Sequence, residues 1–186
     1  YASGDDDPRP DPGNTIRDFF FAEDTRVGLL LFPHVLAYET ARSAAAGTAV
    51  LKGLGSTSLP STRVATRGCF TNAIVLFPQL TWHITDDVFL RGGALFAWAA
   101  APVVDPHVSL LFEDGERIDD DAVNYNGGSP GNYWGTEFDL RFSARLWGHF
   151  YFDLEGALLL PGDALEDEHG DAVPSAMAEA RLTFRF

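Results

Sequence analysis

Residues 176–186 read AMAEARLTFRF and alternate between two kinds of side chain. The even-numbered residues are all apolar, whereas the odd-numbered ones include Glu179, Arg181 and Arg185. Successive side chains of a β-strand point to opposite faces, so this alternation predicts a strand with one apolar and one charged face.

The same alternation recurs in four segments upstream. It is regular over Thr136–Trp147 and Phe150–Leu160, and less regular over Thr71–Ile84 and Val88–Ala101. Pro78 interrupts one of these segments, because proline cannot donate a hydrogen bond to a strand ladder. With the C-terminal segment they make five expected strands.

The connections between these strands alternate in length. Thr85–Asp87 and Gly148–His149 suit tight turns, whereas Pro102–Gly135 and Pro161–Ser175 are long and rich in Asp, Glu, Gly and Pro. Short turns on one side and long loops on the other are typical of outer-membrane barrels. The sequence therefore predicts an all-β fold, an antiparallel transmembrane β-barrel with short periplasmic turns and long acidic extracellular loops.

The charges of the strands fall on one face, which we expect to line the lumen. The predicted lumen-lining residues are Arg91, Glu137, Asp139, Arg141, Arg145, Asp153, Glu155, Glu179, Arg181 and Arg185. Acids and arginines are balanced in this set, so we expect the acids to hold the arginines by ion pairing. The opposite face of the last three strands carries no charge. A lipid-facing band requires this, because Arg or Lys at the bilayer midplane costs about 2–4 kcal/mol.

Aromatic residues gather near the expected strand ends. Trp82 and Trp147 fall at the turn end, and Trp98 and Trp134 at the loop end. Two such groups predict interfacial girdles on either side of a membrane. Because a soluble antiparallel sheet also has one polar and one apolar face, a soluble β-sandwich that binds a ligand remains an alternative.

The chain is expected to be a single barrel segment over residues 1–186, with five membrane strands within 69–186. Residues 4–67 form an expected long loop, in which 34–46 has helix-forming composition. That helix would be either a plug in the lumen or a helix on the surface. Five strands cannot close a membrane barrel, since known ones have at least eight. We therefore expect the chain to be the C-terminal part of a larger barrel, whose other strands would be partners of these.

The composition argues against several other classes of protein. The net charge of -14 argues against a nucleic-acid partner, because phosphate binding needs an excess of Lys and Arg. A single cysteine, Cys69, allows no disulfide within the chain. No arrangement of side chains indicates an enzyme, a cofactor or a metal site. The acidic stretches Glu113–Asp121 and Asp163–Asp171 lack EF-hand spacing, so we expect solvated loops near lipopolysaccharide rather than calcium sites.

Two resemblances follow from short motifs. Phe184 and Phe186 resemble the C-terminal signal by which bacterial outer-membrane proteins are recognised by the barrel-insertion machinery. Tyr1–Pro8, Asn132–Leu140 and Leu160–Ala164 resemble parts of alginate-export-type porins. That resemblance implies a monomeric barrel of many more strands, with a charged lumen that passes anionic sugar polymers or other small solutes. Here acids match the arginines, so alginate itself is not the expected solute.

Together these observations predict a channel or exporter in the bacterial outer membrane that passes small or anionic solutes through a charged lumen. The alternative is a non-conducting scaffold or anchor subunit of a larger envelope complex. The expected partners are outer-membrane lipid, lipopolysaccharide and the insertion machinery.

Overall fold

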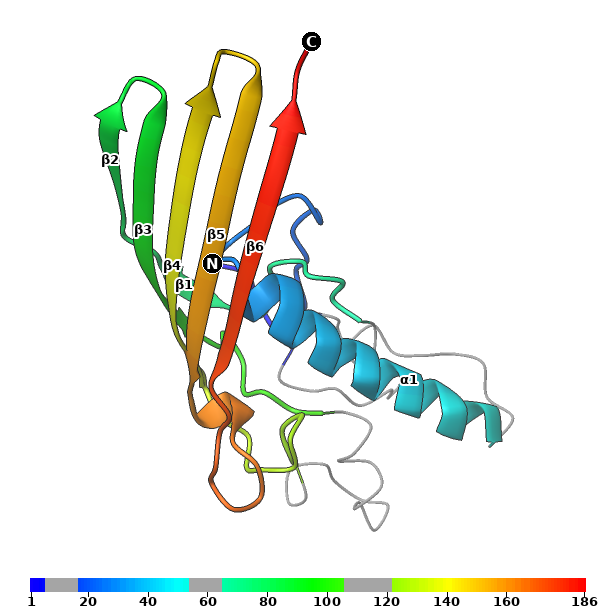
Figure 1. The fold of residues 1–186 in the computed structure, drawn as a ribbon. Helices are drawn as coiled ribbons and strands as arrows, with labels where there is room; N and C mark the ends of the chain where they lie inside the picture. The colour runs from blue at the N-terminus through cyan, green and yellow to red at the C-terminus, as the bar shows by residue number, and fades with distance from the viewer. Residues whose placement is uncertain (6–16, 54–64, 106–121) are drawn as a thin grey trace.

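The computed structural model of the protein describes residues 1–5, 17–53, 65–105 and 122–186 (Figure 1). Its main element is a six-stranded antiparallel sheet in the order β1-β3-β4-β5-β6, with β2 also paired to β3. The strands are β1 (Ile74–Leu76), β2 (Gln79–Thr85), β3 (Val88–Trp98), β4 (Tyr133–Leu146), β5 (Phe150–Pro161) and β6 (Ser175–Phe184). The antiparallel all-β character is confirmed. The sheet is open, so closure into a barrel stays a prediction.

Strands β1 and β2 are two parts of one ribbon that Pro78 interrupts. Both pair with β3 in a continuous register, in which Leu76 lies opposite Phe96 and Gln79 opposite Gly93. The Pro78 carbonyl still accepts the N–H of Ala94 at 3.2 Å. Proline therefore removes a donor without moving any side chain to the other face.

The register places the charges of all strands on one face, which we call the charged face. Arg141 lies opposite both Arg91 and Glu155, and Asp153 lies opposite Arg181. Nine of the ten predicted lumen-lining residues lie in strands at odd-numbered positions of this face, and Arg185 follows β6. A slip of one residue in any strand would have separated them.

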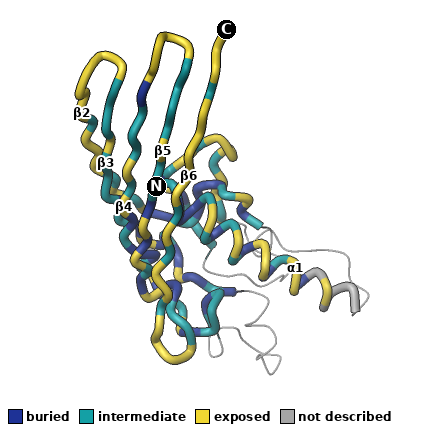
Figure 2. Tube along the Cα trace, in the orientation of Figure 1, coloured by how far each residue is buried: buried dark blue, intermediate teal, exposed yellow. Residues whose placement is uncertain are grey.

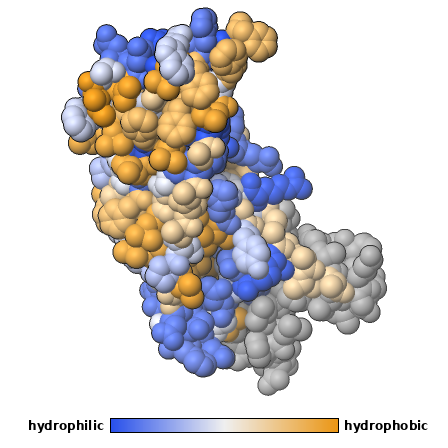
Figure 3. Space-filling view, viewed as in Figure 1, coloured by the Kyte–Doolittle hydropathy of each residue, from blue (hydrophilic) through white to orange (hydrophobic). Residues whose placement is uncertain are grey.

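The even-numbered residues form the opposite, apolar face, and many of its large side chains are exposed. Leu80, Trp82 and Leu182 are 76%, 61% and 64% exposed. Figure 3 shows this surface over the strands as an apolar band with hydrophilic residues at both ends. A water-soluble antiparallel sheet buries its apolar face, whereas here the apolar face is exposed and the charged face is buried only toward the loop end, at residues such as Leu95 and Leu159.

A helical segment lies on the charged side of the sheet. It begins with a π-helical turn, η1 (Leu31–Leu36), and continues as α1 (Ala37–Gly53), so the helix is longer than the predicted 34–46. Leu31 and Phe32 are buried in one apolar cluster with residues of β3 and β5 (Figure 2). From there α1 runs away from the sheet (Figure 1). In the described residues, no helix is both long and apolar enough to cross a bilayer.

One expected girdle residue lies elsewhere. Trp82, Trp98 and Trp147 are exposed, as a girdle requires, but Trp134 is buried at 3% exposure. Its indole N–H donates to the Asn72 carbonyl at 3.1 Å. The register shift between Ala97 and Trp98 breaks the alternation at this end of the sheet, so parity no longer gives the side-chain direction.

Candidate functional site

Glu137 connects the sheet to the helical segment. Its side chain is fully buried, and Oε1 accepts the backbone N–H groups of Leu29 at 2.5 Å and Leu30 at 2.8 Å. Oε2 accepts the N–H of Leu31 at 2.7 Å. The first N–H groups of a helix have no partner within it, and a negative charge at that end is favourable. A carboxylate supplied by β4 therefore caps η1.

The expectation that Glu137 holds an arginine is wrong. Its two oxygens accept the backbone N–H groups of three successive residues in the segment that precedes and begins η1. The physical reason is burial: a carboxylate enclosed at this depth needs several donors, and the uncapped helix turn provides them. Sequence periodicity gave Glu137 the correct face but no information about what covers that face.

Gly28 makes this capping arrangement sterically feasible. Its φ is +74°, and a Cβ built on it would lie 2.9 Å from both Glu137 Oε1 and Leu95 Cδ1. Glycine adopts this conformation without steric cost, and it leaves room for the carboxylate. The chain can thus turn at Gly28 and present three successive N–H groups to one side chain.

Nearer the turn end, the charged face is held by ion pairs. Arg141 contacts Asp153 at 2.8 Å and Glu155 at 3.1 Å, across the β4–β5 ladder. Arg181 contacts Glu179 at 2.7 Å along β6. The sequence predicted ion pairing between acids and arginines on this face, but not which acid each arginine contacts.

Two predicted lumen-lining arginines lie at the turn end and have other partners. Arg145 pairs with Asp87 of the β2–β3 turn, and its N–H donates to the Asp87 carbonyl at 2.8 Å. The Arg185 guanidinium lies 4.8 Å from the ring centre of Tyr151, a cation–π contact. Both residues therefore tie neighbouring turns and strands together at this edge.

Between the sheet and the chain before η1 lies a depression of about 250 Å³. Its charged lining residues are Arg26, Arg91, Asp139, Arg141, Glu155 and Arg181. Four guanidinium groups and two carboxylates give this lining a formal positive balance within a strongly acidic chain. Arg26 is the residue that sequence reasoning missed, since it lies in a region without periodicity and nothing local marks it.

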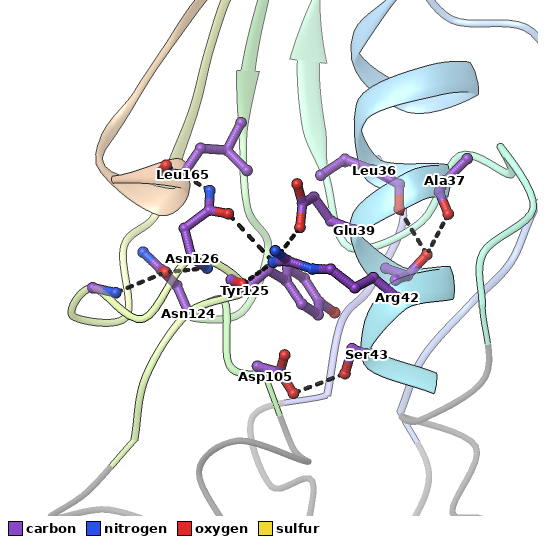
Figure 4. Close-up of polar contacts among 12 residues, drawn as sticks. Leu36, Ala37, Glu39, Arg42, Ser43, Asp105, Asn124, Tyr125, Asn126 and Leu165 are labelled. Atoms are coloured by element: carbon purple, nitrogen blue, oxygen red, sulfur yellow. Dashed lines mark hydrogen bonds and ion pairs between the residues drawn. The ribbon is translucent and has the colours of Figure 1, made fainter. Parts of the chain in front are cut away.

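At the loop end, hydrogen bonds connect the long connections to each other and to α1 (Figure 4). Asn124 is fully buried, and its side chain accepts from the Asn126 N–H at 2.8 Å and donates to the Glu166 carbonyl at 2.8 Å. Ser43 of α1 donates to Asp105 at 2.7 Å. Arg42 binds the Tyr125 carbonyl. The helix therefore starts on the sheet and continues along the β3–β4 connection.

Two carboxylates of the acidic loop 163–171 accept backbone N–H groups. Asp163 Oδ1 accepts the Tyr133 N–H at 2.7 Å, and Asp167 Oδ1 accepts those of His169 and Asp171. These backbone donors lower the pKa of Asp167. In the described residues no group of three or more His, Cys, Asp or Glu side chains could hold a metal ion. The acidic stretch 113–121 lies outside the described residues.

Comparison with known proteins adds no relative to this picture. No family model matches the chain, and neither the curated proteins nor the solved structures contain a match to it. The resemblance to alginate-export-type porins stays a prediction.

Proposed function

We propose that the chain forms part of the wall of a closed β-barrel in a bacterial outer membrane. The observation that carries this proposal is the exposure of a long uncharged apolar face, while the chain's own helical segment packs against the loop end of the opposite face. Hydrocarbon is the solvent that stabilises such a face, whereas in water each exposed leucine or tryptophan would favour aggregation. The soluble sandwich is disfavoured for the same reason.

Backbone pairing supports closure with further strands. In lipid every N–H and C=O needs a partner, so the outer edges of β1, β2 and β6 require neighbours. An antiparallel bridge between Ala2 and Ala73 already occupies the edge beside β1, with reciprocal N–H···O bonds of 2.8 and 3.0 Å. A strand that continued this bridge would run in the direction that an antiparallel barrel needs.

Within this class, we propose a channel or exporter for small or anionic solutes. The charged face would surround the pathway, with ion pairs such as Arg141–Asp153 fixing the positions of its charges. The segment from Arg26 through α1, which we call the insert and which Glu137 caps, would lie inside the lumen and narrow it. This is the plug interpretation of the helix, and capping by Glu137 supports it.

The experiment is to purify the full-length protein from membranes and record single channels in planar bilayers. We expect extraction to require detergent and the reconstituted protein to conduct ions in discrete steps. Recovery in the soluble fraction without detergent would contradict the membrane assignment. Membrane insertion without conductance would contradict the channel.

The second candidate is the non-conducting scaffold. The observation that favours it is the depth at which the insert is held, with Leu31 and Phe32 almost inaccessible to solvent and Glu137 fully buried. An insert fixed this firmly could fill the lumen completely. The same recording separates the two functions, because a filled barrel inserts but carries no current.

A further inference from the structure

The strongest unexplained feature of the molecule is Arg26, an exposed arginine on the insert rather than on the wall. It lines the charged depression together with three arginines of the strands. Its backbone lies two residues before Gly28 and three before Leu29, the first residue whose N–H binds Glu137. The position of Arg26 is therefore set by the same contact that fixes the start of the insert.

The arginines of the depression differ in how far their charge is neutralised. Arg141 is contacted by two carboxylates and Arg181 by one. Arg91 donates to the Thr81 hydroxyl at 3.1 Å and lies 5.8 Å from the ring centre of Phe89, contacts that leave its charge intact. Across the residues that the structure describes, no carboxylate is paired with Arg26 or Arg91. These two guanidinium groups, one from the insert and one from the wall, have donors left for an anion.

We propose that Arg26 determines the anion preference of the pore together with Arg91, and that Glu137 is the positioning residue that places Arg26. This inference rests on the proposed channel function. The chemistry fits small anions that carry a carboxylate, because planar guanidinium groups bind carboxylates through paired N–H donors. The anion selectivity of the pore would thus depend on Arg26 of the insert as well as on Arg91 of the wall.

The test uses the full-length protein in planar bilayers under a potassium chloride gradient, with chloride as the anion probe. Arg26→Gln removes the charge at an exposed position, so folding should be preserved. We expect the chloride-to-potassium permeability ratio to fall about twofold or more. Arg67→Gln is the matched control, since Arg67 lies on the same N-terminal part of the chain, is exposed and pairs with Glu23 at 3.9 Å.

Glu137→Gln tests the positioning role. An amide cannot accept all three N–H groups, so the insert should loosen, the permeability ratio should fall as in Arg26→Gln, and conductance should rise. The double variant Arg26→Gln/Glu137→Gln should have the same permeability ratio as Glu137→Gln alone, because Arg26, once displaced, no longer contributes to selectivity. A heat-modifiable band on semi-native gels confirms that each variant still forms a barrel.

The outcomes separate the two proposals. A wild-type barrel that inserts but carries no current overturns the channel function. A conducting barrel in which Arg26→Gln leaves the permeability ratio unchanged overturns the role of Arg26 and leaves the channel intact. Additive losses in the double variant overturn the positioning role of Glu137.

Discussion

The charged face of the sheet is stabilised by different interactions in its two halves. In the half beside the tight turns, the charged face is stabilised by side-chain ion pairs such as Arg141–Asp153. In the half beside the long connections, Leu95, Ala97 and Leu159 replace charges on that face, and the insert buries them together with Glu137. The composition of the charged face therefore depends on what packs against it: apart from Glu137 it is apolar where the insert packs, and it is charged where its side chains are exposed.

The exposed face, by contrast, has the same character in both halves. It stays uncharged from Ile74 and Leu76 at the loop end to Leu182 and Phe184 at the turn end. The apolar face therefore requires the same surroundings along its whole length. The charged face, by contrast, contacts the insert at one end and is exposed at the other. Three predictions examine this difference, in order of expected effect.

The largest effect is expected from a charge on the outer face. Leu154→Arg places a guanidinium in the middle of the exposed apolar surface and should lower the free energy of unfolding in a bilayer by about 2–4 kcal/mol. Thr183→Arg, on the charged face of the neighbouring strand β6, should lower it by less than about 0.5 kcal/mol. The measurement is urea-induced unfolding in lipid vesicles. Equal losses in the two variants would mean that both faces meet the same solvent, and the comparison of faces would fail.

A smaller effect is expected at the junction between insert and wall. Gly28→Ala combines a positive φ with a Cβ that crowds Glu137 and Leu95, so we expect a loss of stability of about 2 kcal/mol. Gly148→Ala is the matched control, because its φ is +73° but nothing lies within 4 Å of an added Cβ. The loss of stability in Gly148→Ala should come from backbone strain alone and amount to about 1 kcal/mol. Denaturant midpoints of the two variants give the difference, and no excess at Gly28 would argue against a tight junction.

The smallest effect is expected from the pH dependence of stability that Asp18 causes. Burial, reinforced by the charge of Asp5, raises the pKa of Asp18 from 3.8 to about 6. The folded protein therefore binds a proton more tightly than the unfolded chain does, and this contribution to stability is lost as the pH rises from about 4 to 6. With the partial exposure of the side chain discounted, we expect a loss of about 1 kcal/mol.

Asp18→Asn should remove this pH dependence, because asparagine does not titrate. Asp24→Asn, on an exposed turn of the same part of the chain, should leave it unchanged. Thermal unfolding between pH 4 and 7 measures both variants. A wild-type stability that rises with pH across this window would show that other groups dominate.

Part of the site could be predicted because it follows from local alternation. The odd positions of β4, β5 and β6 gave the charged face, and the balance of acids and arginines predicted that ion pairs would form on it, without saying which residues pair. One signal of the insert was also present: the second face of β3 becomes small and apolar toward Ala97 and Ala99. Arg26 and Gly28 could not be predicted, since their roles depend on contacts with residues more than 60 positions away in the chain.

By itself, the sequence determined the strands and the face of most of their residues, because a period of two is a property of the local backbone and needs no partner; it failed at Trp134, where the register shifts. Only the tertiary structure decided what covers each face. Glu137 and Asp139 follow the same alternation, yet one caps a helix and the other lines a depression. The reason is that burial and hydrogen-bond partners come from segments brought together by folding, and alternation along a strand carries no information about them.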